Sequence, residues 1–178
     1  MSTVEIARGM VGSYLLSATR PGGTLTNSTT ADQDFASIYT IPANLLTTNT
    51  ILRVTLNMGL ATGVSAATIT QYLKLGATKI CNHVSPSNLT DSLTKYASFH
   101  FYVVGTAAAG ASVAVECATM WGGFSAPQVG FGALNNVAQP VAAIATNGAL
   151  TIVPGAAWSA TGSADVLTLL SAIVEQLN

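Results

Sequence analysis

Two histidines and seven acidic residues are the side chains of this sequence that could carry acid–base chemistry. His83 and His100 are separated by turn-forming residues, and no nucleophile motif such as GxSxG accompanies either of them. We interpret His100 as a surface or interface residue. His83 lies in a turn-rich stretch, where a binding role stays open. Neither histidine gives a reason to expect a catalytic base.

Asp32 and Asp34 are the acidic pair closest in sequence, separated by a single residue. On a strand their side chains would share a face. A calcium site needs about six to eight oxygen ligands, so a loop or a strand start is the simpler reading of this pair. A glycosidase with two carboxylates about 5–10 Å apart is a further alternative, but no aromatic cluster supports it. We therefore predict a protein without catalytic residues, metal or cofactor.

Charged residues make up only 7% of the 178-residue chain, compared with about 25% in ordinary domains. A surface with so few charged residues is either covered by partner subunits or rich in Thr, Ser, Asn and Gly. We favour the first interpretation, an obligate oligomer. The six basic residues are scattered, whereas a phosphate-binding face needs clustered positive charge. No apolar stretch reaches the roughly 20 residues of a membrane helix. We therefore expect neither nucleic-acid binding nor membrane insertion.

Cys81 and Cys117 are the two cysteines of the chain. The N-terminal residues carry Glu5 and Arg8 before any apolar stretch, which is not typical of a secretory signal. Buried free thiols are therefore the favoured reading, with a disulfide as the alternative. Two cysteines without CxxC spacing do not make a convincing zinc site.

Period-two alternation of apolar residues is the dominant pattern, and it predicts half-buried strands. The clearest segment is Ile51–Leu60, in which every second residue is apolar. Tyr96–Val104 and Ser112–Trp121 alternate in the same way. The residues expected to form the core are Leu52, Val54, Leu56, Met58, Phe99, Phe101, Val113 and Val115.

Further strands are expected at both ends of the chain and between the clear ones. Val166–Leu177 is apolar on both faces over part of its length, so we expect it to be covered on both sides. A C-terminal helix is an alternative for that segment. Asn147-Gly148 is a hairpin signal. About eight or nine strands predict an all-β single domain, as a sandwich or a barrel. The other expected strands are Gly12–Ala18, Phe35–Ile41, Thr68–Leu75, Ala138–Ala145 and Leu150–Val153.

Aromatic residues are the candidates for a contact surface. Tyr96, His100 and Tyr102 alternate along one strand, so they share an outward face, where aromatic rings bind proteins or sugars. Cross-strand packing is the simpler alternative. Trp121 and Trp158 are expected to anchor either the core or an interface. Together these five residues form the possible interface.

Several segments resemble virion proteins of tailed bacteriophages with a jelly-roll fold. The first part of the resemblance reads Tyr39-Thr40-Ile41-Pro42-Ala43-Asn44-Leu45-Leu46, then Ile51-Leu52-Arg53-Val54, then Leu73-Lys74-Leu75-Gly76. The second part comprises a Phe-rich strand, a small-residue strand, and a tryptophan before the terminal strand: Phe99–Val104, Ser112–Ala118 and Ala157-Trp158-Ser159.

This resemblance implies an antiparallel β-sandwich of jelly-roll type at residues 35–178, assembled as a homotrimer. Residues 1–34 lie outside it and are expected to form an N-terminal arm or an extra strand. The implied role is non-catalytic, as a capsid decoration or cement protein that contacts the major capsid protein or other virion proteins in the virion. The alternative is a receptor-binding module at a fibre or baseplate tip that recognises cell-surface saccharide.

Overall fold

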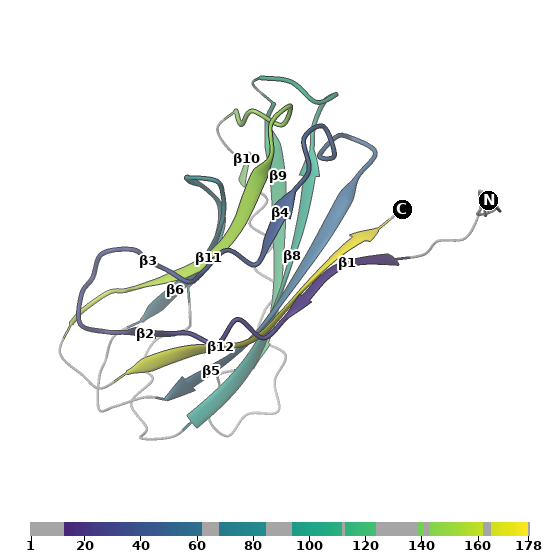
Figure 1. Ribbon diagram of the computed structural model, residues 1–178. Coiled ribbons are helices and arrows are strands. Elements are labelled where there is room, and N and C mark those ends of the chain that lie inside the picture. Colours follow the sequence, from purple (N-terminus) through teal and green to yellow (C-terminus); the bar gives the residue numbers. More distant parts are fainter. Residues whose placement is uncertain are drawn as a thin grey trace.

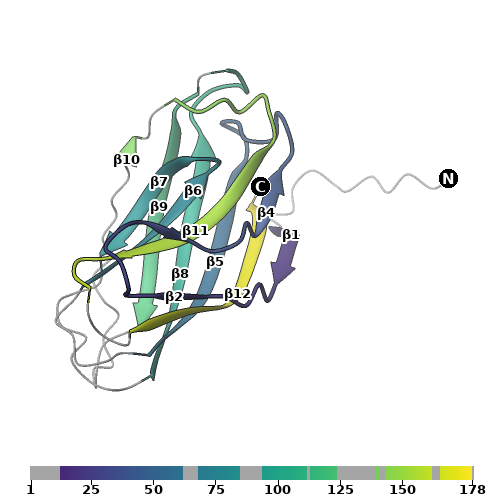
Figure 2. The same ribbon diagram turned by 60° about the vertical axis from the view of Figure 1, so that its left-hand side comes forward.

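Two antiparallel β-sheets face each other and enclose a hydrophobic core in a computed structural model of the chain (Figures 1 and 2). The structure describes residues 13–61, 68–84, 94–111, 113–123, 139–140, 143–161 and 165–177. Within these ranges every regular element is a strand. The prediction of an all-β antiparallel sandwich is confirmed.

The large sheet has the strand order β1-β12-β5-β8-β9-β10, and β2 pairs separately with β12. All the pairs described are antiparallel. Its three longest strands, β12, β5 and β8, are neighbours at its centre. The strand bounds are β1 (Ser13–Thr19), β2 (Thr24–Thr26), β5 (Ile51–Ala61), β8 (Thr94–Gly105), β9 (Val115–Gly123), β10 (Gln139–Pro140) and β12 (Val166–Leu177).

The small sheet has the strand order β3-β11-β6-β7, and β4 pairs with another part of β11. Strands β3 and β4 thus pair with different parts of the same strand, β11. The strand bounds are β3 (Gln33–Asp34), β4 (Tyr39–Ile41), β6 (Ile69–Leu75), β7 (Thr78–Val84) and β11 (Leu150–Trp158).

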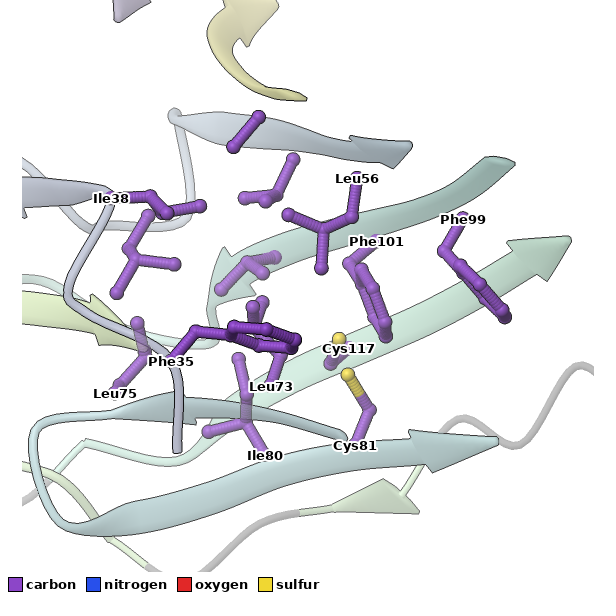
Figure 3. Packing of buried hydrophobic residues seen from close by; sticks show 14 of the residues in the cluster. Phe35, Ile38, Leu56, Leu73, Leu75, Ile80, Cys81, Phe99, Phe101 and Cys117 are labelled. Atoms are coloured by element: carbon purple, nitrogen blue, oxygen red, sulfur yellow. The ribbon is translucent and has the colours of Figure 1, made fainter. Parts of the chain in front are cut away.

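The core lies between the inward faces of the two sheets (Figure 3). From Leu52 to Met58 the residues of β5 are alternately buried and half-buried, as expected for a strand with one face toward solvent. All eight residues expected in the core are at most 4% exposed. Each fully buried aliphatic or aromatic side chain contributes about 1.5–3 kcal/mol, so this layer dominates stability.

Strand β12 is the C-terminal segment for which a helix was the alternative. It pairs with β5 along its whole length, with a bulge between Leu169 and Ser171. The extra residue of the bulge, Leu170, points outward and is 42% exposed. The second apolar face therefore comes from a local irregularity. Within this chain that face is open, so the expectation of cover on both sides is not met.

Several local predictions need correction. Of the expected strand Phe35–Ile41, only Tyr39–Ile41 is a strand, β4. Thr78–Val84 forms β7, so the backbone of His83 lies in a strand and not in a turn-rich loop. Strand β11 continues five residues past Val153 to Trp158. Asn147-Gly148 closes no hairpin, because Ile144 before it bridges to Val113, whereas β11 after it pairs with β4 and β6.

The N-terminal segment is part of both sheets. Strands β1 and β2 pair with β12, and β3 pairs with β11. Residues 13–34 thus pair with β11 and β12, two strands from the later part of the chain. Residues 1–12 lie outside the described residues, as do residues 62–67.

Candidate interaction surface

The outward side of the large sheet, which we call the outer face, brings the predicted interface residues of β8 together. Tyr96, His100 and Tyr102 occupy alternate positions, opposite Gly59, Thr55 and Arg53 of β5. His100 and Tyr102 are half-buried, whereas Tyr96 is 68% exposed. Three of the five predicted residues therefore share one face.

The two tryptophans behave differently. Trp158 is 2% exposed and belongs to the core, because it occupies an inward position of β11. It is therefore not available to a partner as a surface residue. Trp121 pairs in register with Phe99, and its side chain lies outside the described residues, as does that of His83.

A polar band crosses the middle of the outer face. Arg53 of β5 contacts Glu175 of β12 through its Nε at 2.8 Å and a terminal nitrogen at 2.7 Å. The amide of Asn57 donates to the hydroxyl of Ser171 at 2.8 Å. Neighbouring strands thus satisfy each other's polar groups, and the band is neutral.

The electrostatics of the band favour a charged arginine and a neutral histidine. The hydrogen bond from Arg53 to Glu175 raises the pKa of the guanidinium. Burial lowers the pKa of His100, and the charge of Arg53 lowers it further, while Glu175 acts in the opposite direction. The Nδ1 atom of His100 lies 3.0 Å from the Thr55 hydroxyl, so the ring is held by a neutral partner.

Apolar residues flank the polar band at both ends of the outer face. At one end the ring of Tyr96 lies over Gly59, with Leu170 beside it. At the other end Ile51 is 42% exposed, and Leu15 of β1, which is 64% exposed, lies beside Glu175. Exposed apolar residues thus surround a neutral polar strip, and an exposed apolar surface of this kind suits a contact site.

The outward side of the small sheet contrasts with this arrangement, because side chains of β6 and β7 reach over β11 to residues 32–34 at its edge. The hydroxyl of Tyr72 donates to Asp34 Oδ1 and the carbonyl of Gln33, both at 2.9 Å. Lys74 pairs with Asp34 at 2.8 Å, and Lys79 pairs with Asp32 at 2.6 Å. Burial and the hydrogen bond to Asp34 raise the pKa of Tyr72.

This charged cluster joins β3 to the rest of the small sheet, and it includes both Asp32 and Asp34. The two lysine nitrogens lie 4.4 and 5.2 Å from the centroid of the Tyr72 ring, which offsets the repulsion between them. Both carboxylates have a lysine partner. The loop or strand-start reading fits this geometry, since Asp34 ends β3 and Asp32 immediately precedes it.

The described residues contain no group of three or more His, Cys, Asp or Glu side chains that could hold a metal ion. Within the same ranges there is no helix with the length and hydrophobicity that a membrane crossing needs. No protein-family model matches the chain, and no curated protein matches it either.

Sequence reasoning missed the partners of the interface residues. Arg53, Glu175 and Leu170 lie on the same face as Tyr96 and His100 only because β5 pairs with both β8 and β12. The outward alternation of Arg53 in its own strand was the one available signal. The strand that would lie beside it could not be read from spacing.

Proposed function

We propose that this chain is a non-catalytic structural subunit of a tailed-bacteriophage virion, a capsid decoration or cement protein that binds the capsid lattice as a homotrimer. The observation that carries the proposal is the outer face of the large sheet, where exposed apolar residues lie on either side of the Arg53–Glu175 ion pair. Such a face suits a neighbouring subunit better than solvent.

The jelly-roll part of the proposal rests on nested strand pairs. Strand β1 pairs with β12, β4 with β11, β5 with β8, and β6 with β7, so early strands pair with late ones in reverse order. A jelly roll has this order, because it is a long antiparallel hairpin that is wrapped around a core to form two sheets. The pair β12·β5 then completes the large sheet, and the pair β11·β6 completes the small sheet. Strands β9 and β10 extend the large sheet.

The dimensions of the outer face support a subunit contact. Its central strands have 11 and 12 residues, so at about 3.3 Å per residue the face is roughly 36 Å long. Four neighbouring strands, β12, β5, β8 and β9, at about 4.8 Å give a width of roughly 19 Å. The resulting area, on the order of 700 Å², approaches the ~800 Å² per partner of a stable interface.

Unpaired charge is scarce on the described surface, which also suits an assembly. Three ion pairs involve six charged residues, and Asp165 is buried against Asn27. Of the charged side chains that the structure describes, only Arg20 is exposed without an ion-pair partner. A subunit with so little surface charge gains solubility when its faces are covered.

Light scattering of the purified chain at micromolar concentration tests the assembly. We expect about three times the chain mass of 18.1 kDa. Leu170→Glu places a charge on the outer face and should shift the mass toward that of one chain. Val84→Glu is the matched control, because Val84 is 51% exposed on the other sheet and should leave the mass unchanged. A wild-type mass of one chain contradicts the trimer.

The place of the protein in the particle needs a separate measurement. Quantitative mass spectrometry of virions that contain the chain should give hundreds of copies if it decorates the head. A few copies per particle would instead favour the fibre-tip alternative, for which the exposed ring of Tyr96 is a candidate sugar-stacking residue. Binding of the purified chain to host glycans, abolished by Tyr96→Ala, would decide for that alternative.

A further inference from the structure

Cys81 and Cys117 meet across the core of the sandwich. Cys81 lies in β7 of the small sheet and Cys117 in β9 of the large sheet, and both are buried. Figure 3 shows their sulfur atoms pointing toward each other from opposite layers. No disulfide joins them in this structure.

The two sheets approach each other closely at this place. Packed sheets are usually about 10 Å apart, whereas a disulfide needs its Cα atoms within roughly 4.4–6.8 Å. Strand β7 is the edge of the small sheet, and β9 lies next to the edge strand β10. Among strands from different sheets in the described part, β7 and β9 come within 8 Å, Cα to Cα, over the greatest extent.

The contact between the two thiols is direct. A hydrogen bond between Cys117 and Cys81, together with burial, raises the pKa of Cys117 above its ordinary value. Inside the closed core the thiol therefore stays protonated. Since the thiolate is the nucleophile of disulfide exchange, the folded protein keeps Cys117 unreactive, and burial shields both residues from a small disulfide.

We propose that Cys81 and Cys117 form an inter-sheet disulfide when the chain folds in the presence of a low-molecular-weight disulfide, and that the closed core then preserves whichever redox state folding has set. One cysteine thiolate attacks the small disulfide, forming a mixed disulfide and releasing one small thiol. The second cysteine thiolate attacks the mixed disulfide and displaces the other small thiol. The two electrons and two protons lost by the cysteines end on the two released thiols.

The bond would tie the two sheets at their adjacent edges. It closes a loop from residue 81 to residue 117 and so restricts the unfolded chain. It also links β7 directly to β9, whereas the described hydrogen bonds of each strand run within its own sheet. We therefore expect the oxidised form to be the more stable one.

Refolding of the full chain with oxidised or reduced glutathione tests the proposal. After oxidative refolding we expect an intact mass lower by two hydrogen atoms, no alkylation under denaturing conditions, and a melting temperature about 5–15 °C above that of the reduced form. Reduced protein that is already folded should keep both thiols when oxidised glutathione is added.

Cys81→Ala and Cys117→Ala are the controls, because alanine is small and apolar enough for the core. Each should melt at the same temperature after oxidative and reductive refolding. Two alkylated cysteines or a stable glutathione adduct after oxidative refolding would overturn the disulfide. So would an oxidised form that melts no higher than the reduced one. Oxidation of the folded protein as fast as during refolding would overturn the protection by the core.

Discussion

The outward sides of the two sheets both have ion pairs, but these ion pairs join different parts of the chain. On the small sheet, Lys74 and Lys79 extend beside Tyr72 to residues 32–34, where β3 pairs with β11. On the large sheet, Arg53 and Glu175 pair between two neighbouring strands, β5 and β12. The first set of contacts joins the edge strand β3 to the sheet, and the second links two central strands.

This difference indicates where a partner would bind. On the small sheet, four charged residues and the hydroxyl of Tyr72 bond to one another. On the outer face the charged side chains that the structure describes are Arg53 and Glu175, which pair with each other near exposed apolar residues. A second subunit on the outer face would meet few desolvated charges, and such contacts favour association.

Leu56→Asp has the largest expected effect, because it disrupts the hydrophobic core between the two sheets. Leu56 is fully buried between the sheets, and an unpaired carboxylate there should prevent folding. Asn57→Asp moves the same charge one residue along the strand to the outer face and should give a folded protein. Circular dichroism during thermal melting measures both. A cooperative transition in Leu56→Asp would contradict the inward position.

Gly155→Ala should disturb the small sheet alone. Residue 155 faces Tyr72 in register, and a Cβ there would overlap the tyrosine ring. We expect a loss of about 1–3 kcal/mol in the free energy of unfolding, measured by denaturant titration. Gly148→Ala, with open space around the residue, is the control and should change little. In a Tyr72→Ala background the cost should fall, so an unchanged cost would disprove the overlap.

The ion pair of the outer face should contribute more than that of the small sheet. Arg53→Met leaves Glu175, whose side chain is 17% exposed, without its counter-ion. We expect a cost of about 1 kcal/mol, partly recovered in Arg53→Met/Glu175→Gln. Asp32→Asn breaks a pair whose side chains are 41% and 42% exposed and should cost about 0.5 kcal/mol or less. Equal costs in denaturant titrations would remove this contrast.

Titration of His100 should have the smallest effect. Its pKa is lowered in the folded protein, so below about pH 6.5 the unfolded chain binds a proton more readily than the folded one. Stability should therefore fall as the pH decreases through 6.5 and level off below the folded pKa. His100→Gln should show a weaker decline between about pH 7.5 and pH 5.5 in denaturant titrations. A variant with the same pH dependence as the wild type would rule His100 out.

The regular strands could be predicted from sequence because their pattern is local. In β5 and β8 each residue shows by its own character which face it occupies, so the core residues and the common face of Tyr96, His100 and Tyr102 follow from alternation. The partners of that face could not be predicted. Arg53 and Glu175 are 122 residues apart, and only the strand order brings them together.

Two strands were missed or shortened because irregularities interrupt the alternation. In β7 a bulge places Ile80 and Cys81 in succession on the buried side. In β11, Pro154 lacks a backbone donor. The carbonyl of Pro154 accepts a hydrogen bond from the backbone N–H of Phe35, so the nitrogen of Pro154 also points to the side of β11 where β4 and β3 lie. Pro154 lies between the residues of β11 that pair with β4 and those that pair with β3. No backbone donor is needed at that position.

The pairing of β1 with β12 also has a consequence for folding. Strand β12 lies between β1 and β5, so the large sheet lacks an internal strand until residues 166–177 join segments far from them in sequence. Such contacts of long sequence separation make folding slow, on the millisecond-to-second scale.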